Sequence, residues 1–290
     1  MNFNHLEYAA AVAKAGSIRK ASQNLFVSQP YLSGMVKGLE DELGYRIFSR
    51  TATGVILTKE GERFLDCARV ILMELKKLRE INAATDEREL NIASYYATYV
   101  MEQFLKFHNA STYKFSDKIR EMGNEEVMES VASGESTIGI IFFAPEKKQK
   151  YKKLIEKNHF HEELFLPPLQ MYVFLHRTHP LAKMPKIKAE NLNDYPFVIY
   201  NDKSSRNYLH ILGIADHPQL LEVSDRGGFY DTLRSGEYLT TMAFWNPPSN
   251  GEYLAIPFHE KTYQLYSCCV TAQNYKLSKR EKEFLEFLKK

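Results

Sequence analysis

Gln29, Ser33 and Lys37 recur every four residues, so in a helix they would share one face. An amide, a short hydroxyl and an ammonium on one face are suited to contacting the base edges and phosphates of DNA. The helix is expected to begin at Ser28, a residue type that caps helices, and Pro30 is tolerated in its first turn. Free backbone amides at such a helix start also attract a phosphate. Residue types and spacing therefore predict a helix that contacts nucleic acid.

Apolar residues over positions 1–44 recur at spacings of three and four, which predicts three short helices. Ser17 is a natural N-cap for the second helix, and Gly16 and Gly44 end the first and the third. The small Ala21 precedes a tight turn into the third helix. Such a close approach of two helices is typical of a helix-turn-helix.

The segment after Gly44 predicts a hairpin, because two short apolar stretches flank a turn rich in threonine and glycine. Arg50, Thr51 and Thr53 lie at its tip, where they are suited to contacting a phosphate or the minor groove. Residues 1–58 are therefore predicted to form a winged helix-turn-helix DNA-binding domain.

This region resembles the DNA-binding domain of LysR-type transcriptional regulators over about sixty residues with hardly a gap. The resemblance is carried by Ala15-Gly16-Ser17-Ile18, Ala21-Ser22, the run from Leu25 to Ser33, Leu39-Glu40, Leu43-Gly44, Ile47-Phe48, Arg50 and Leu57-Thr58 with Gly61. The candidate DNA-binding residues are Ser17, Ser28, Gln29, Pro30, Tyr31, Ser33, Lys37, Arg50, Thr51 and Thr53. The chain departs from the family at Gly34, where arginine is usual, and a glycine inside a helix costs about 1 kcal/mol relative to alanine.

Residues 59–88 are predicted to form a linker helix with a narrow apolar seam in steps of four and three. The seam consists of Phe64, Ala68, Ile71, Leu75 and Leu78, with charged residues on the other faces. A long helix with one such stripe needs a partner, and we favour a second copy of the chain over its own C-terminal domain. In the resembling family this helix is the dimer interface, and the resemblance implies a tetramer of two dimers. Cys67, just off the seam, is expected to have a packing role.

From Leu90 onward, short strands alternate with helices, which predicts parallel, doubly wound α/β structure. We expect an effector domain over residues 89–290, with lobe I from 89–163 and 264–290 and lobe II from 164–263. It resembles, more weakly, the LysR-type effector domain, which is similar to periplasmic solute-binding proteins. The landmarks are Gly134 to Ile141, His179-Pro180-Leu181-Ala182 and Asn191 to Phe197. The chain departs from the family at Thr137, where aspartate is common, and at Gly236-Glu237-Tyr238, which replaces a Gly-rich turn.

Hydroxyl-bearing residues follow predicted strand ends in both lobes, where α/β sheets bind ligands. The candidate effector-binding residues are Ser94, Tyr95, Tyr96, Thr98, Tyr200, Ser204 and Arg226. Hydroxyls with an arginine suit a small carboxylate, so we expect a small, anionic metabolite. Ordinary loop and cap roles would explain any one of these residues equally well.

Other classes of protein fit the sequence less well. The scattered histidines form no HExxH, and GxSxG and P-loop motifs are missing, so no enzyme is predicted. The cysteines Cys67, Cys268 and Cys269 have no metal-ligand spacing, and neither metal nor cofactor is expected. Residues 164–263 contain no cysteine, which argues against thiol-based peroxide sensing. A solute-binding protein of a transport system would have a secretory signal, and we do not find one in this sequence.

The net charge of +2 is small, so the DNA signal is local and does not come from a basic chain. No apolar run approaches the ~20 residues that span a bilayer, and we expect a cytoplasmic protein without a membrane partner. The expected partners are an operator in double-stranded DNA, further copies of the chain and a small-molecule effector, with RNA polymerase as another candidate. A protein partner for the two lobes remains an open alternative to a metabolite.

Overall fold

The computed structural model describes residues 3–51, 54–80, 89–111, 116–163, 166–248, 251–259, 262–273 and 275–289. The predictions for Thr53, for the linker over residues 81–88 and for the side chain of Leu78 lie outside the described residues. Contacts divide the chain near residue 86 into two compact units, an N-terminal and a C-terminal one. Each is described by itself.

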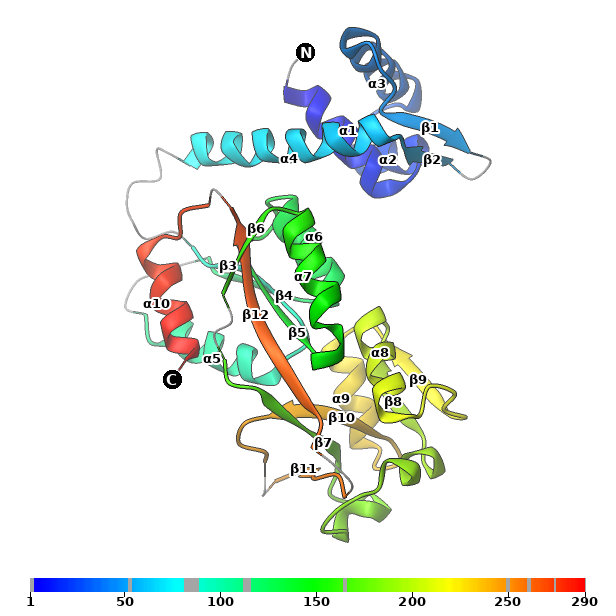
Figure 1. Ribbon diagram of the computed structural model, residues 1–290, viewed down its shortest axis with the longest axis vertical. Coiled ribbons are helices and arrows are strands. Elements are labelled where there is room, and N and C mark those ends of the chain that lie inside the picture. The colour runs from blue at the N-terminus through cyan, green and yellow to red at the C-terminus, as the bar shows by residue number, and fades with distance from the viewer. Residues whose placement is uncertain are drawn as a thin grey trace. The chain divides into compact units, whose positions relative to one another are not determined.

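The N-terminal unit is a winged helix-turn-helix with a long following helix (Figure 1). Its elements are α1 (Phe3–Ala15), α2 (Ile18–Asn24), α3 (Gln29–Leu43), β1 (Phe48–Thr51), β2 (Gly54–Leu57) and α4 (Lys59–Glu80). The expected caps are present. The Ser17 hydroxyl accepts a hydrogen bond from the Lys20 amide, the Ser28 hydroxyl accepts one from the Tyr31 amide, and Gly44 ends α3 with a φ of 75°.

Glu40 ties the end of α3 to the hairpin β1–β2. Its carboxylate is buried and accepts hydrogen bonds from the backbone amides of Ile47 (2.8 Å) and Phe48 (3.0 Å) and from the Arg46 guanidinium (2.7 Å). A buried carboxylate is tolerated because these donors replace its water. The strand that carries Arg50 is thereby held in a fixed position beside α3.

The first part of α4 belongs to the core of the N-terminal unit. Phe64 and Ala68 are buried there together with residues of α1 and α3. The predicted seam is therefore wrong at its start, because these two side chains are covered by their own domain. Further along the helix, Val70 and Ile71 are 48% and 38% exposed. Cys67 is exposed as well, so this thiol does not have the expected packing role within the chain.

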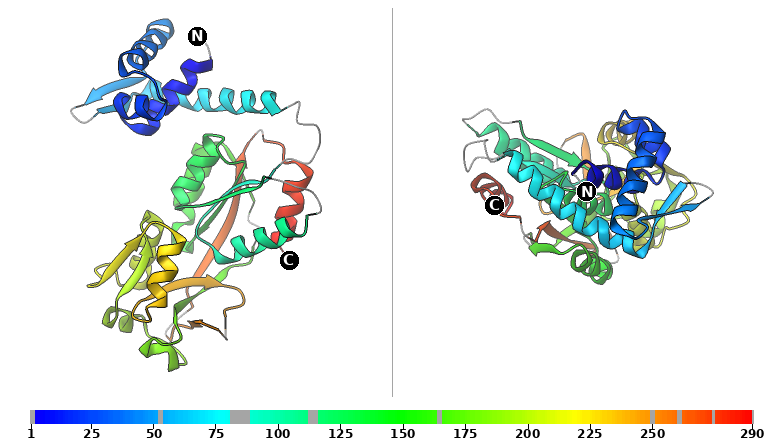
Figure 2. Two further views of the ribbon diagram at one scale, coloured as in Figure 1. Left: turned by 180° about the vertical axis from the view of Figure 1, so that it is seen from behind. Right: turned by 90° about the horizontal axis from the view of Figure 1, so that it is seen from above.

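The C-terminal unit is an α/β domain built on one continuous path of strands in the order β4-β3-β5-β12-β7-β10-β8-β9 (Figure 2). We call the half around β3 the β3 lobe. Its elements are β3 (Asn91–Ser94), α5 (Thr98–Asn109), β4 (Lys118–Glu121), α6 (Asn124–Ala132), β5 (Ile138–Phe143), a 3-10 turn (Pro145–Lys147), α7 (Lys148–Lys157), β6 (Phe160–Glu163), β12 (Gln264–Ala272) and α10 (Lys279–Leu288).

The half around β8 is called the β8 lobe. Its elements are β7 (Leu169–His176), 3-10 turns (Pro180–Lys183 and Ala189–Asp194), β8 (Phe197–Tyr200), α8 (Lys203–Leu212), β9 (Leu220–Val223), α9 (Arg226–Arg234), β10 (Leu239–Phe244) and β11 (Tyr253–Ile256). The helix expected over residues 188–192 is a 3-10 turn, and α8 and α9 were not foreseen.

Helices cover both faces of each lobe, as the alternating pattern predicts. In the β3 lobe, α5 and α10 pack on one face of the strands and α6 and α7 on the other. In the β8 lobe, α8 and α9 pack on opposite faces of β8. Strand β12 connects the lobes, because Gln264 and Leu265 pair with β7 while its continuation pairs with β5.

No helix among the described residues is both long and apolar enough to cross a membrane.

Candidate functional site

The exposed surface of α3 carries the predicted DNA-contacting side chains. Gln29, Pro30, Tyr31 and Lys37 are exposed and Ser33 is half-buried. Arg50 and Thr51 are exposed on β1, whereas the Ser17 and Ser28 hydroxyls accept the capping hydrogen bonds described above. The exposed candidate residues are thus those at the start of α3 and on the wing.

Gly34 and Gly38 leave the solvent-facing side of α3 without side chains on two successive turns. A Cβ atom added at either position would meet nothing within 4 Å. Just before the helix, Phe26 is 96% exposed and has a positive φ of 53°, a backbone region that favours glycine or asparagine. The helix-turn-helix thus exposes bare helix backbone at Gly34 and Gly38 and, separately, the aromatic ring of Phe26.

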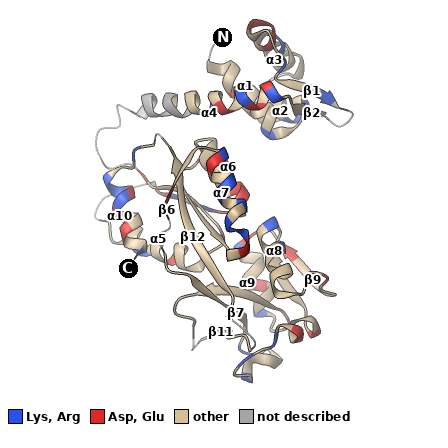
Figure 3. Cartoon of the chain, in the orientation of Figure 1, with Lys and Arg blue, Asp and Glu red and all other residues tan. Residues whose placement is uncertain are grey.

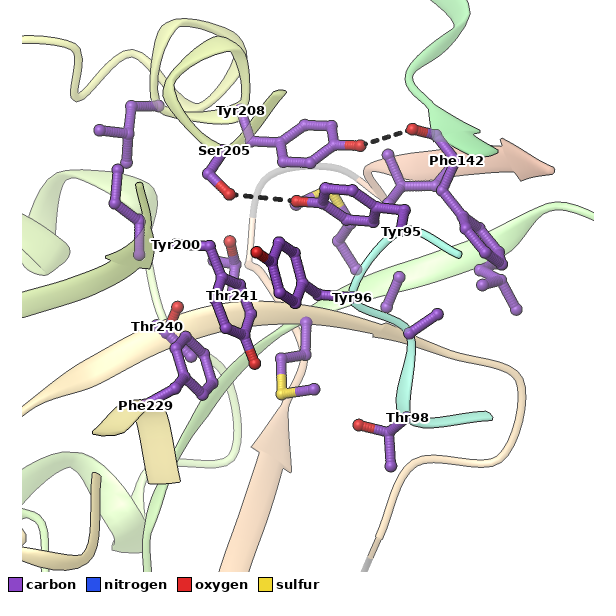
Figure 4. A pocket seen from close by; sticks show the side chains of 18 residues that line it. Tyr95, Tyr96, Thr98, Phe142, Tyr200, Ser205, Tyr208, Phe229, Thr240 and Thr241 are labelled. Atoms are coloured by element: carbon purple, nitrogen blue, oxygen red, sulfur yellow. Dashed lines mark hydrogen bonds between the residues drawn. The ribbon is translucent and has the colours of Figure 1, made fainter. Parts of the chain in front are cut away.

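The C-terminal unit contains a pocket where the ends of β3 and β8 meet the middle of β10 (Figure 4). Its volume is about 60 Å³. The lining is aromatic, aliphatic and hydroxyl-bearing, and it consists of Tyr95, Tyr96, Ala97, Thr98, Phe142, Leu169, Met171, Ile199, Tyr200, Ser205, Tyr208, Leu209, Phe229, Thr240, Thr241, Met242, Ala243 and Leu265. Both lobes contribute, so a ligand here would touch both.

Hydrogen bonds between the lobes close the pocket on one side. The Tyr95 hydroxyl lies 3.1 Å from the Ser205 hydroxyl, and the Tyr208 hydroxyl donates to the Phe142 carbonyl at 2.9 Å. Asp202 caps α8 by accepting from the Ser205 amide at 3.0 Å and from its hydroxyl at 2.6 Å. Burial raises the pKa of Asp202, and these hydrogen bonds oppose the shift.

Arg226 does not line the pocket, and its charge is neutralised. It forms a two-point ion pair with Glu121, the last residue of β4, and donates to the Thr98 hydroxyl at 3.3 Å. The lining residues include no lysine, arginine or histidine. In Figure 3, β7, β10 and β12 are likewise free of charged residues. The expectation of an arginine that holds a carboxylate therefore has no support from this geometry.

Four of the seven predicted effector residues meet in the pocket: Tyr95, Tyr96, Thr98 and Tyr200. Ser94 and Ser204 are buried behind it, and their hydroxyls are engaged, the first with the Tyr95 carbonyl (2.8 Å) and the second with Tyr151 (3.3 Å). The sequence analysis selected Ser204, whereas the pocket is lined by its neighbour Ser205.

The other lining residues were missed for different reasons. Tyr208 follows Ser205 by three positions on α8, so recognising this helix would have placed its ring on the pocket side, and Phe229 lies on α9, a helix that the sequence did not single out. Thr240 and Thr241 lie in β10, a strand that the sequence did not single out. In the described part of the chain, no group of three His, Cys, Asp or Glu side chains could hold a metal ion.

Comparison with known proteins identifies the N-terminal unit. Residues 3–62 match the family model of the bacterial regulatory helix-turn-helix proteins of the lysR family. The hydrogen peroxide-inducible genes activator of Haemophilus influenzae is 27% identical over 207 residues, which cover 70% of this chain and 65% of that protein. The HTH-type transcriptional regulator TfdT of Cupriavidus pinatubonensis is 36% identical over 151 residues, which cover 50% of this chain and 66% of TfdT. The matched part thus spans slightly less than two thirds of these relatives.

Solved structures resemble the chain over its whole length. A full-length OxyR variant from Pseudomonas aeruginosa has a TM-score of 0.60 at 21% identity and covers 100% of this chain and 98% of its own. Full-length CbnR, in a complex with its target DNA, has a TM-score of 0.53 at 19% identity and covers 99% of each chain. At these identities the likeness shows the fold, a helix-turn-helix followed by a two-lobed α/β domain. With the family match of residues 3–62, these findings show that the chain carries a lysR-type helix-turn-helix domain, followed by a C-terminal unit with the fold of these solved structures.

Proposed function

We propose that this chain is a DNA-binding transcriptional regulator whose C-terminal domain senses a small molecule. The observation that carries the proposal is the pairing, in one chain, of a lysR-family helix-turn-helix with an α/β domain whose pocket is lined by both lobes. Such a pocket favours a small ligand over a protein partner, because a ligand bound between lobes can shift their arrangement. A cytoplasmic location belongs to the same proposal, since the regulator has to reach the operator.

In this proposal α3 enters the major groove. Gln29 contacts a base edge and Lys37 meets the phosphates, while Arg50 on the wing contacts the backbone beside the groove. Ser33, Tyr31 and Thr51 complete the contact surface. Two such heads are needed for a two-half-site operator, and the exposed residues of α4 are proposed to join them as a dimer, with a tetramer formed from two dimers.

The test is a map of bound sites across a bacterial genome, followed by gel shifts on the selected sequence over a series of salt concentrations. Gln29→Ala should relax base preference by roughly 1–3 kcal/mol. Arg50→Ala should weaken all sequences alike and lower the salt slope by about one. Lys282→Ala, which removes an exposed charge from α10, is the matched control and should change neither quantity. If Gln29→Ala and Arg50→Ala both behave like this control, α3 and the wing are not the contact surface.

A further inference from the structure

The pocket is too small to hold a ring in the arrangement described. Its volume is about 60 Å³, whereas a dry protein cavity that binds benzene measures about 150 Å³. A ligand with even one ring must therefore displace a side chain or move the lobes apart. The question is which lining group can leave at least cost.

Tyr96 is the side chain best placed to move. It is half-buried, in the turn between β3 and α5, and its ring lies on that of Tyr200 with centroids 3.7 Å apart and planes 6° from parallel (Figure 4). Tyr200 in turn stacks on Phe229, at 4.4 Å and 8°, so three rings from two lobes form one stack with Tyr96 at its end. Close, nearly parallel stacking is less favourable than offset or edge-to-face packing, so the outer ring gains less from Tyr200 than from its edge-to-face contact with Tyr95 (5.7 Å, 76°).

Hydrogen bonds do not hold Tyr96 in place. Its hydroxyl makes none to the described residues, and neither does the hydroxyl of Tyr200 or Thr241. The other lining tyrosines differ, since Tyr95 is bound to Ser205 and Tyr208 to the Phe142 carbonyl. Displacing Tyr96 would break no such bond and would leave two free hydroxyls, on Tyr200 and Thr241, for the incoming ligand.

The electrostatics of the pocket disfavour a charged ligand. Burial is the main reason that the pKa of Tyr96 is raised to about 12, and the negative charges of Asp202 and Glu126 raise it further, so these two carboxylates act against an anion beside the ring. The nearby cation, Arg226, is already bound to Glu121. A cation would lose its hydration without gaining an ion-pair partner, because no carboxylate is among the lining residues.

We infer that the ligand of this pocket is an uncharged planar ring that takes the place of Tyr96 on Tyr200. The ring would stack between the lobes and accept or donate hydrogen bonds at the Tyr200 and Thr241 hydroxyls. Release of Tyr96 removes its stacking contact between the β3 lobe and the β8 lobe, which couples binding to their relative position. The inference rests on the proposed function, in which this pocket is the effector site.

The experiment uses three planar probes of nearly equal size that differ in charge: benzamide, benzoate and benzamidine. The full chain is labelled with 3-fluorotyrosine, and the ¹⁹F signal of Tyr96 is identified by its loss in Tyr96→Phe. Tyr172 on β7, which does not line the pocket, is identified in the same way as the control. Benzamide should shift the Tyr96 signal and leave Tyr172 unchanged. Benzoate and benzamidine should bind at least about tenfold more weakly, because an unpaired charge is costly to bury.

Two variants separate stacking from a general cavity effect. Tyr200→Leu should abolish benzamide binding, and Tyr96→Ala should tighten it while preserving the preference for benzamide over the two ions. Equal binding of benzoate, benzamide binding without a shift of Tyr96, or the failure of all three probes to bind would overturn the inference. Gel shifts on the selected DNA test the proposed function independently of the probes. Probe binding can fail while DNA binding persists, and the reverse, so failure of this inference and failure of the proposed function are distinguishable.

Discussion

Arg226, the first residue of α9, and Glu121, the last residue of β4, form an ion pair that joins the two lobes. The Arg226 Nε atom lies 2.6 Å from Glu121 Oε2, and a second guanidinium nitrogen binds the other carboxylate oxygen. The side chains are only 26% and 10% exposed, so water competes weakly for either charge. The pair therefore holds the end of one sheet against the start of a helix in the other lobe.

We predict that breaking this pair destabilises the C-terminal unit. Arg226→Met leaves the Glu121 carboxylate without its main partner and should lower the free energy of unfolding by about 1–3 kcal/mol. Trp245, the single tryptophan of the chain, reports on this unit in a urea titration. Arg234→Met is the matched control on the same helix, because Arg234 is 59% exposed in its ion pairs and should matter by under about 1 kcal/mol. If the two changes lowered the free energy of unfolding equally, the Arg226–Glu121 pair would contribute no more to stability than the exposed ion pairs of Arg234.

A second buried pair makes stability depend on acid pH. The Asp117 side chain is fully buried against Arg280, and it also lies 2.8 Å from His108 and accepts from the Leu90 amide at 2.8 Å. Burial alone would raise the pKa of Asp117, but the hydrogen bonds from Arg280 and His108 lower it below the ordinary value. A depressed carboxyl pKa stabilises the folded state above the unfolded-state pKa, about 4, and that contribution is lost as the pH falls toward the folded-state value.

Asp117→Asn should therefore lower the free energy of unfolding at pH 7 by more than at pH 3. The wild-type curve should fall across this range, and the curve of the variant should fall less, because the variant lacks the titrating group. Trp245 fluorescence in urea at each pH measures both. A constant difference between the two proteins from pH 7 to pH 3 would contradict the assignment.

Lysine substitutions should have different effects in the exposed part and in the buried part of α4. Val70→Lys with Ile71→Lys places charges on a surface that is free within the chain, so the variant should stay folded and lose its partner copy. Ala68→Lys places a charge in the core of the helix-turn-helix unit and should unfold that unit. Light scattering and circular dichroism distinguish the two results. A wild-type chain that is a monomer at micromolar concentration, or a double variant that remains a dimer, would remove α4 from the proposed interface.

The helix-turn-helix could be predicted from the sequence because its signals are local. Ser17, Ser28 and Gly44 mark helix ends within a few residues of the amides and carbonyls that they satisfy. The alternation of strands and helices likewise predicted an α/β domain, since buried parallel strands are apolar and their connections are helical. The strand directions and the helices of the β8 lobe did not follow from these patterns. The sheet is mixed and not parallel throughout, because β12 pairs antiparallel with β5 and β7, and α8 and α9 were not foreseen.

The pocket could not be predicted in the same way, because its shape depends on contacts between distant segments. Arg226 was placed in the cleft as a free cation, yet its partner Glu121 lies 105 residues away in the chain. The departure at Thr137 also has a non-local reason. The Thr137 hydroxyl donates to the buried Glu281 at 2.7 Å, where an aspartate would place a second negative charge. Spacing along the chain carries no information on such pairs.

The cysteines yield the last prediction, which concerns peroxide. Several relatives are named as peroxide-inducible activators, but here Cys268 and Cys269 are buried in β12. Burial raises the pKa of Cys268 to about 12 and that of Cys269 well above its ordinary value, so neither forms a reactive thiolate near pH 7. In the native chain iodoacetamide should modify Cys67 alone, and Cys67→Ser should react only after unfolding. Hydrogen peroxide should leave the footprint of Cys67→Ser on DNA unchanged. Native labelling of Cys268 or Cys269, or a peroxide-dependent footprint in this variant, would mean that the β12 thiols become accessible and act as a sensor.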